Sequence, residues 1–326
     1  MNLFPLYQSL GSPLPTPAEM AEWDRNSIRE FGIPGMLLME NASREAFHAI
    51  NALLPPERRV LVLMGGGNNG GDGACLARHL LDAGHSVLVC HMKPLDSLPE
   101  DARAHARIAR AVGTPFAPVF FVNNELAVPP EYGEIARSPH AVIDALLGTG
   151  FSGPLREPER EAVRFVNRLG ETVPVFSLDI PSGLDGITGA PCPEAVRATH
   201  TVSFEAAKPG LVMPQAARFT GTLHIRPIGI PRAAQARRPA SFYRLEPRER
   251  AWPPAEPGMH KGQAGRVLIL GGSAGLTGAP ALAALGALRA GAGLVTVACP
   301  GALEPQVRSA FPEMMTRPLG QGDAWT

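Results

Sequence analysis

The chain has 326 residues, and its 30 basic side chains balance its 30 acidic side chains, so the formal net charge is zero. This balance gives no electrostatic case for binding nucleic acid or a membrane surface, and no apolar run reaches the roughly 20 residues that span a bilayer. The four cysteines form no C-x-x-C pair and the start has no signal-peptide pattern, so we expect a cytoplasmic chain with structural cysteines. None of the nine histidines sits in H-E-x-x-H or beside a cysteine pair, so the pattern does not predict zinc.

Two helices are expected before the first strand. Residues 16–19, Thr-Pro-Ala-Glu, form a capping box with proline at the first helical position. The second helix runs from about residue 36 to residue 53 and contains Glu40 and Asn41, which either meet solvent, bond to a neighbouring helix or belong to a site. These helices either cover the sheet or reach a partner subunit, and we expect a homo-oligomer.

The segment 60–90 organises the rest of the chain. An apolar run at 60–64 predicts a buried parallel strand, and nine residues of only Gly, Asn and Asp follow at 65–73. A helix that stops at Gly84 and a second apolar run at 86–90 complete a strand–turn–helix–strand unit. The predicted turn is a phosphate-sized cradle at the carboxyl end of the first strand.

A phosphate needs several backbone N–H groups and no Cβ atoms in the way, which favours glycine. A plain tight turn is the alternative, but it does not need two asparagines and an aspartate between its glycines. The spacing Gly65, Gly67, Gly70 also satisfies G-x-G-x-x-G. No acidic residue follows the second strand to bind a ribose, which counts against an ordinary NAD dehydrogenase. A protein that binds a 2′-phosphate through Lys93 stays open as an alternative.

Strands and helices alternate through the next 140 residues, which predicts an α/β fold with a doubly wound, mostly parallel, Rossmann-like sheet and helices on both faces. The expected helices are 99–112 and 157–169, and the expected strands are 118–122, 140–147, 173–180, 198–205 and 222–228. Three strands end in an amide or acid beside glycine, at Asn68–Asn69, Asp144 and Asp179. Because ligands bind outside the carboxyl ends of parallel strands, these side chains predict one site. Lys208 is either a surface lysine or a residue that neutralises a phosphate at the rim of this site.

The C-terminal part has a different character. Residues 231–257 are rich in Pro, Arg and Glu and are interpreted as a linker between a first domain, 1–230, and a fragment, 258–326. The fragment begins a second strand–helix–strand unit with an expected strand at 266–270, a helix at 281–290 and a strand at 294–298. It is too small to bury its own core.

Three motifs in this order resemble the NAD(P)H-hydrate epimerase family. They are NNGGDG at 68–73, VIDALLGTG at 142–150 and LDIPSG at 178–183, and the resemblance covers about residues 15–230 together with GIPG at 32–35 and LMENA at 38–42. From His260-Lys261-Gly262 onward the chain is similar to the start of the ADP-dependent NAD(P)H-hydrate dehydratase, a ribokinase-like α/β domain that is incomplete here. The later nucleotide-binding motifs of that domain are absent, so no dehydratase activity is expected.

The resemblance implies an enzyme that interconverts the R and S forms of hydrated NADH and NADPH, with Asp179 as the catalytic residue. It also implies a potassium ion held by Asn69, Asp144 and Ser182, and their amide, carboxylate and hydroxyl oxygens suit a hard cation. The implied substrate-binding residues are Asn68, Asn69, Gly70, Gly71, Asp72, Gly148, Thr149, Gly150, Phe151, Ser152, Gly153, Pro154 and Asp179.

Inverting C6 of the hydrated ring requires a bond to that carbon to break and reform. The ring nitrogen can expel the hydroxyl as water to give an iminium, or the ring can open and close. Either route needs one group that gives and takes a proton, for which Asp179 is the candidate. The alternative role for Asp179 is only to bind a ribose or a water molecule. The rival functions are a dinucleotide-dependent oxidoreductase and a non-catalytic binding or interaction module of the same fold.

Overall fold

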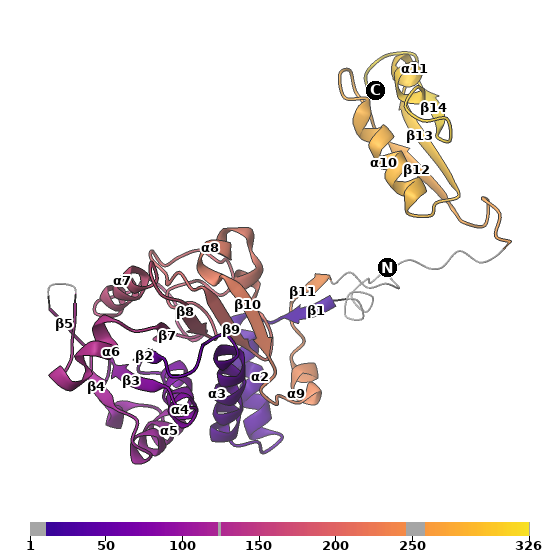
Figure 1. Cartoon of the computed structure of the whole chain (residues 1–326). Helices are drawn as coiled ribbons and strands as arrows, with labels where there is room; N and C mark the ends of the chain where they lie inside the picture. Colours follow the sequence, from indigo (N-terminus) through magenta and orange to yellow (C-terminus); the bar gives the residue numbers. More distant parts are fainter. Residues whose placement is uncertain (1–10, 123–124, 246–257, 326) are drawn as a thin grey trace. The chain divides into compact units, whose positions relative to one another are not determined.

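The structure is a computed structural model that describes residues 11–122, 125–245 and 258–325. The chain divides after Leu245 into two compact units, and each is described by itself (Figure 1). Among the described residues, no helix is both long enough and apolar enough to cross a bilayer. The expectation about a signal peptide concerns the chain's start, of which residues 1–10 lie outside the described part.

A seven-stranded sheet forms the centre of the first unit, in the order β10-β9-β8-β7-β2-β3-β4. Every neighbouring pair is parallel. The strands are β2 (Arg59–Met64), β3 (Ser86–His91), β4 (Phe116–Pro118), β7 (Ala141–Ala145), β8 (Val175–Leu178), β9 (His200–Phe204) and β10 (Thr222–Arg226). Helices cover both faces, so the predicted doubly wound α/β fold is confirmed.

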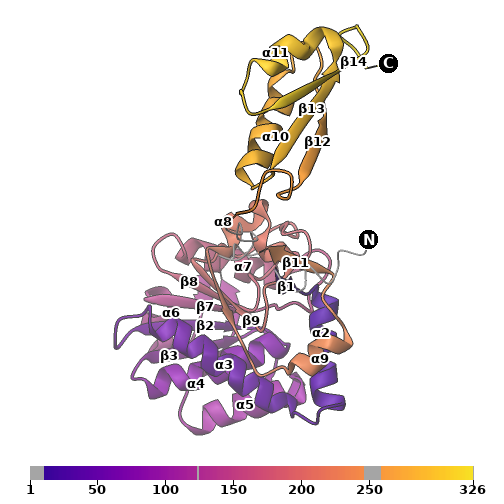
Figure 2. The ribbon, with the colours of Figure 1, turned by 90° about the vertical axis from the view of Figure 1, so that its right-hand side faces the viewer.

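The two faces of β2 show why this strand is apolar throughout. Val60, Val62 and Met64 pack into the core under α3 (Gly35–Asn51), α4 (Asn68–Asp82) and α5 (Glu100–Ala111). Leu61 and Leu63 point the other way, into the core under α6 (Gly133–Arg137) and α7 (Glu159–Leu169). Figure 2 shows α3, α4 and α5 on one side of the sheet and α7 on the other. Side chains alternate between the faces of a strand, so a strand covered on both sides needs an uninterrupted apolar run.

The first helix, α2 (Pro17–Arg29), begins at the predicted capping box. Thr16 Oγ1 accepts a hydrogen bond from Glu19 N at 3.2 Å, and Thr16 N donates to Glu19 Oε2 at 2.9 Å. Trp23 is 1% exposed and anchors this helix in the core. The remaining short elements of the unit are β1 (Gly11–Leu14), β5 (Phe120–Val122), β6 (Glu125–Ala127), α8 (Ala217–Thr220), α9 (Arg232–Arg237) and β11 (Phe242–Leu245).

The predicted nine-residue glycine turn is wrong in its length. Only residues 65–67 connect β2 to the next helix, because α4 already begins at Asn68. The glycines inside α4 serve packing instead. A Cβ on Gly71 would lie 2.7 Å from Ala102 Cα, and a Cβ on Gly70 would lie 2.2 Å from Gly65 O. Close approach of the helix to its neighbours therefore outweighs the low helix propensity of glycine.

The predicted boundary at residue 230 also differs from the structure. Residues 232–245 form α9 and β11, and β11 pairs antiparallel with β1 in a two-stranded sheet. Trp23 Nε1 donates to Arg238 O at 2.6 Å, and Ser241 Oγ donates to Glu19 Oε1 at 2.5 Å. The weak periodicity of this segment reflects its role as a strap held by α2, while residues 246–257 of the expected linker lie outside the described part.

The second unit contains a small parallel sheet in the order β12-β13-β14. Its elements are β12 (Arg266–Leu270), α10 (Gly278–Arg289), β13 (Leu294–Pro300), α11 (Glu304–Arg308) and β14 (Met315–Leu319). The last strand was not predicted. Val295, Val297 and Cys299 of β13 are fully buried, whereas Leu268 and Leu270 of β12 are 61% and 66% exposed. The unit thus buries its central strand and leaves one face of its sheet open.

Candidate functional site

The strand order reverses between β2 and β7, which are neighbours in the sheet. From β2 the chain proceeds outward through β3 and β4, and from β7 it proceeds outward in the other direction through β8, β9 and β10. The loops that leave two such strands diverge and open a crevice. Here these are residues 65–67 after β2 and the loop that follows Ala145 at the end of β7.

A cleft of about 660 Å³ lies at this switch point. Helices α2 and α3 line one side of the cleft, and the loops after β2, β7 and β8 line the other. Its polar lining includes Asp24, Asn68, Asn69, Asp72, Lys93, Asp101, Thr149, Glu159 and Asp179, and its apolar and glycine lining includes Ile28, Leu38, Met39, Gly66, Gly67, Gly148, Gly150, Phe151 and Phe204.

Asp179 follows β8 and has a φ of +64°, in the left-handed region that few residues other than glycine adopt. Its backbone N–H donates to Val202 O at 2.7 Å, which fixes this turn to β9. One carboxylate oxygen, Oδ2, accepts from Thr149 N at 3.1 Å. An unfavourable backbone conformation held by the surrounding structure is common at functional sites.

The other oxygen of Asp179 accepts a hydrogen bond from Lys208 Nζ at 2.5 Å. The Lys208 side chain is fully buried, and its ammonium also donates to Ser203 Oγ at 3.1 Å and to Phe204 O at 3.2 Å. All three donors of the ammonium thus have acceptors. Neither role considered for Lys208 from the sequence matches this position, because it lies beneath Asp179 and away from the protein surface.

Asp24 and Asp72 add two carboxyl groups to the cleft. The pKa of Asp24 is raised to about 6, mainly by burial and then by the charge of Asp179, while Lys208 opposes the shift. Burial likewise raises the pKa of Asp72 well above the usual range, with Asp179 and Asp24 adding to the effect. A carboxyl group with a pKa near 6, such as Asp24, can exchange a proton near neutral pH.

Asp24 was not identified from the sequence. It lies on α2 four positions after Met20 and four positions before Ile28, and all three line the cleft. An acidic side chain on the inner face of an amphipathic helix was the available signal. Lys208 could be found only from the fold, because it lies 29 residues from Asp179.

Beneath the loop after β7, Asp144 is fully buried and accepts four hydrogen bonds. Ser182 Oγ and Leu146 N donate to its Oδ1, while Ser177 Oγ and Ser182 N donate to its Oδ2. Ser182 Oγ also accepts from Leu147 N at 2.9 Å. Burial raises the pKa of Asp144, and these bonds oppose the rise. Asp144 and Ser182 therefore lie together, as expected. They hold the loop after β7, which lines the cleft.

Asn69 is 7% exposed, and neither its Oδ1 nor its Nδ2 has a hydrogen-bond partner among the described residues. It lies against Gly148, where an added Cβ would be 3.2 Å from Asn69 Cβ and 3.3 Å from Asp179 Oδ2. A buried amide without partners is costly unless a ligand, ion or water satisfies it. This orphaned oxygen is the feature of the site that fits a bound hard cation.

Not every predicted binding residue lines the cleft. Asn68, Asn69, Asp72, Gly148, Thr149, Gly150, Phe151 and Asp179 do so. Gly70 and Gly71 are packed inside the first turns of α4, and Ser152, Gly153 and Pro154 are exposed in the loop between β7 and α7, away from the cleft lining. The structure therefore brings eight of the predicted residues to one cleft and leaves five outside it.

The two polar residues inside α3 have separate roles. Asn41 Nδ2 donates to Ile228 O at 3.0 Å, which ties α3 to the segment after β10. Glu40 accepts a hydrogen bond from Arg78 Nη2, and its Oε1 lies 2.9 Å from His79 Nε2. Neither side chain lines the cleft.

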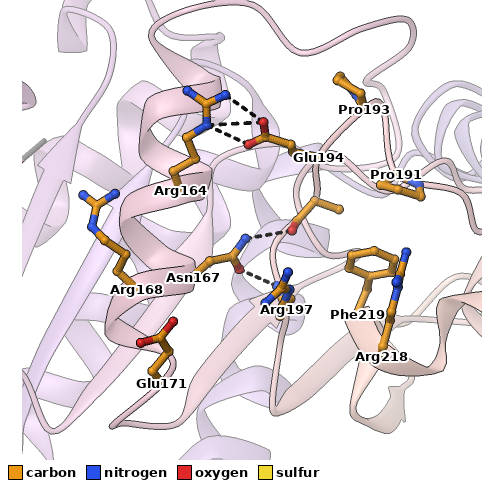
Figure 3. Close-up of a pocket in the computed structure, with 11 residues that line it drawn as sticks. Arg164, Asn167, Arg168, Glu171, Pro191, Pro193, Glu194, Arg197, Arg218 and Phe219 are labelled. Atoms are coloured by element: carbon orange, nitrogen blue, oxygen red, sulfur yellow. Dashed lines mark hydrogen bonds and ion pairs between the residues drawn. The ribbon is translucent and has the colours of Figure 1, made fainter.

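A second cleft, of about 450 Å³, lies between α7 and the loops around residues 191–197 and 218–219 (Figure 3). Arg164 and Arg160 donate to the Glu194 carboxylate, and Asn167 bonds to the backbone of Ala195 and Arg197. The side chains of Arg164, Glu194 and Asn167 are thus engaged in bonds within the cleft wall. It lacks the strand-end carboxylates of the switch-point cleft, so the latter is the candidate active site.

The fold and this cleft define an α/β enzyme that binds a ligand at the switch point of a parallel sheet and carries acid–base groups there. Residues 36–210 match the family profile described as YjeF-related protein N-terminus, and residues 267–325 match that of NAD(P)H-hydrate dehydratase. The first match covers more than half of the chain, and the chain belongs to the NAD(P)H-hydrate epimerase family.

Curated relatives agree with this assignment. The bifunctional NAD(P)H-hydrate repair enzyme Nnr of Methanothermobacter thermautotrophicus is 40% identical over 313 residues, which cover 94% of this chain and 56% of the relative. The NAD(P)H-hydrate epimerase of Rhodopirellula baltica is 40% identical over 221 residues, which cover 67% of this chain and 85% of the relative. The chain spans less than two thirds of the length of the bifunctional relatives.

A solved structure supports the fold. The crystal structure of yeast ynu0 superposes with a TM-score of 0.58 at 22% identity, covering 73% of this chain and 97% of the yeast chain. At this identity the likeness concerns the fold alone.

Proposed function

We propose that the first unit catalyses the interconversion of the R and S epimers of hydrated NADH and NADPH. The observation that carries this proposal is the position of Asp179 in the switch-point cleft, where Lys208 Nζ and Thr149 N hold both of its oxygens. The names of the relatives supply the substrate class, and the cleft supplies groups suited to moving a proton at one end of a dinucleotide.

The glycine-lined end of the cleft suits the pyrophosphate. The N-cap of α4 is Gly67, and no side chain caps this helix, so its first N–H groups are open to an anion. Lys93 lies beside Gly66, where an added Cβ would be 2.7 Å from Lys93 Cγ. The helix terminus and this cation together favour negative charge at the entrance of the loop after β2.

The carboxyl-rich end of the cleft suits the hydrated ring. Loss of the C6 hydroxyl as water requires a proton on the departing oxygen, and return of water to the other face requires removal of a proton. Burial shifts the pKa values of Asp72 and Asp24 upward, in the direction that lets these carboxyl groups donate a proton. Asp179, held in its ion pair, is the group placed to accept a proton and return it. Ring opening at the same carbon would use the same exchange.

We further propose that Asn69, Asp144 and Ser182 hold a potassium ion. The unpartnered Asn69 oxygen and the oxygens of the buried Asp144–Ser182 pair are hard donors, which suit this ion. The ion would supply fixed positive charge and order the loop between Ala145 and Thr149; the proton transfers themselves belong to the carboxyl groups. A homo-oligomer remains a prediction, for which sedimentation velocity is the test.

The activity is tested with one purified epimer of hydrated NADH. The chain should convert it to the other epimer, followed by chromatography, and Asp179→Asn should abolish most of this conversion. Hydride transfer to or from free NAD(P) would favour the oxidoreductase instead. A folded chain that binds the hydrate and leaves the ratio of epimers unchanged would favour the non-catalytic module.

A further inference from the structure

Behind the cleft, three helices bring three metal-ligating side chains together. Glu40 comes from α3, Cys75 from α4 and His105 from α5, and one donor atom of each lies within 4.8 Å of the other two. None of these residues lines the switch-point cleft. Sulfur, imidazole nitrogen and carboxylate oxygen are the three donor types that zinc binds in proteins.

His105 gives the strongest indication of a missing ligand. Its Nε2 lies 3.2 Å from Met36 O, and a carbonyl only accepts, so Nε2 carries the hydrogen. In the neutral ring, Nδ1 therefore presents a lone pair toward Glu40. This nitrogen has no hydrogen-bond partner among the described residues, although the side chain is only 2% exposed. A histidine whose second nitrogen bonds to a backbone carbonyl is also the usual arrangement of a metal ligand.

The two distances from Glu40 Oε2 to the other donor atoms suit a small tetrahedral ion. Cys75 Sγ lies 3.2 Å from Glu40 Oε2, and His105 Nδ1 lies 3.7 Å from the same oxygen. Zinc bonds of 2.0 to 2.3 Å place neighbouring tetrahedral ligands about 3.3 to 3.6 Å apart. Both distances thus differ from the required values by a few tenths of an ångström.

We propose that Glu40 Oε2, Cys75 Sγ and His105 Nδ1 bind one zinc ion that joins α3, α4 and α5. On binding, the Cys75 thiol loses its proton to solvent and the resulting thiolate donates its electron pair to the metal, without any change of oxidation state. Burial raises the pKa of the free Cys75 thiol to about 12, so zinc binding competes with this proton. The fourth position is open to water or to His79 Nε2, which lies 2.9 Å from Glu40 Oε1.

Arg78 is the main competitor for this site. Its Nη2 lies 2.7 Å from both Glu40 oxygens and 3.6 Å from Cys75 Sγ. Zinc on Oε2 leaves Oε1 to Arg78, so the guanidinium becomes a neighbour that orients the carboxylate. The rim is partly open, with Arg78 18%, His79 17% and Glu40 31% exposed, which gives the ion a path to the buried donors.

Cobalt provides a direct test, because it occupies zinc sites and its bond to a thiolate absorbs in the near ultraviolet. The reduced, metal-stripped full-length chain should bind one Co²⁺ with this sulfur-to-metal band, and one equivalent of Zn²⁺ should bleach it. Cys75→Ala should abolish the band, whereas Cys90→Ala, which removes a buried thiol on β3, should retain it.

Two further variants separate metal binding from a loss of folding. His105→Gln should weaken Co²⁺ binding by about 10- to 100-fold. Arg78→Gln should strengthen it by about tenfold, the equivalent of one competing charge. Circular dichroism checks that each variant is folded. A folded wild-type chain without the band, a band that survives in Cys75→Ala, or an affinity unchanged in both His105→Gln and Arg78→Gln would each overturn the proposal.

Discussion

Lys208 Nζ lies 2.5 Å from Oδ1 of Asp179, yet the two side chains meet solvent differently, at 0% and 13% exposure. The Lys208 side chain is buried inside the first unit, while the Asp179 carboxylate also faces the cleft. A buried ammonium is stable only with a counter-charge and acceptors for its protons. The catalytic candidate is therefore also a structural partner, and its replacement should affect both activity and stability.

The first prediction concerns Asp179→Asn. Turnover should fall by about 10² to 10⁴-fold, the usual range for a lost acid–base group. Asparagine tolerates the positive φ of this position, so the backbone should be retained. The free energy of unfolding should fall by about 3 kcal/mol because Lys208 loses its counter-charge. Epimer interconversion and denaturant unfolding are the measurements, with Asp96→Asn, an exposed carboxylate outside the cleft, as control. Near-wild-type turnover would remove Asp179 from the mechanism.

The second prediction concerns Lys208→Met, which replaces the buried ammonium by an apolar chain of similar length. Stability should fall by less than in Asp179→Asn, because the partner left behind is partly exposed and can hydrate. Turnover should still fall, by about 10- to 100-fold, because a displaced carboxylate loses its orientation toward the ring. The two variants are compared in the same assays. A Lys208→Met chain with unchanged kcat and KM would show that the lysine is needed for folding alone.

The apolar strands were the easiest part of the fold to predict. An uninterrupted run such as 60–64 indicates a strand covered on both faces, and the structure places it at the centre of the sheet. The glycine segment was harder, since glycine serves both turns and close packing. Gly65 is in a turn and Gly71 is in a helix, and only the position of α5 distinguishes them.

The candidate site was predictable where its residues end strands. Asp144 and Asp179 follow apolar runs, so the topology places them at one edge of the sheet. Asp24 and Lys208 reach the same place from a helix and from a segment after β9, and no local pattern fixes such tertiary contacts. The strap at 232–245 was missed for a related reason, because its short elements are stabilised by α2 and β1.

The third prediction concerns pH and Asp24. The folded pKa of about 6 lies above the ordinary value of 3.8, so between these values the folded chain binds more protons than the unfolded chain. This group therefore lowers the free energy of unfolding as pH rises from about 4 to 6. Asp24→Asn should stabilise the chain by about 1 to 3 kcal/mol at pH 7 and leave it unchanged near pH 3.5.

Its control is Asp96→Asn, an exposed carboxylate outside the cleft, which should change stability little at either pH. Denaturant unfolding at both pH values gives the comparison. Asp24 lowers the free energy of unfolding at pH 7, and groups in a cleft that lower stability often serve activity. Turnover in Asp24→Asn should therefore fall. Equal stability gains at both pH values would contradict the assigned shift.

The fourth prediction concerns potassium. Replacing K⁺ by Li⁺ or by a bulky organic cation should lower activity or substrate affinity, and K⁺ should raise the unfolding temperature by binding the folded state. Asn69→Ala should lose this thermal response, because it removes the unpartnered oxygen. Gln215→Ala, which removes an amide outside the cleft, is the matched control. A wild-type chain with full activity and the same unfolding temperature in potassium-free buffer would exclude the ion.

The last prediction compares two truncated chains. Deleting residues 258–326 should leave epimerase activity intact, because the first unit holds the whole cleft. Adding ADP should change nothing, and ADP-dependent regeneration of NADH by the full chain would refute this expectation.

Ending the chain at residue 230 should have a different result. It removes the acceptor of Trp23 Nε1, the Ser241 hydroxyl that bonds Glu19, and the β11 partner of β1. A buried donor left without its acceptor costs about 1 to 3 kcal/mol, and the uncovered core adds to that loss. Since α2 also carries Asp24, the shorter chain should unfold at lower denaturant and lose turnover, whereas the chain ending at 257 should match the full-length protein in both. Equal stability of the two truncated chains would show that the strap contributes nothing to the site.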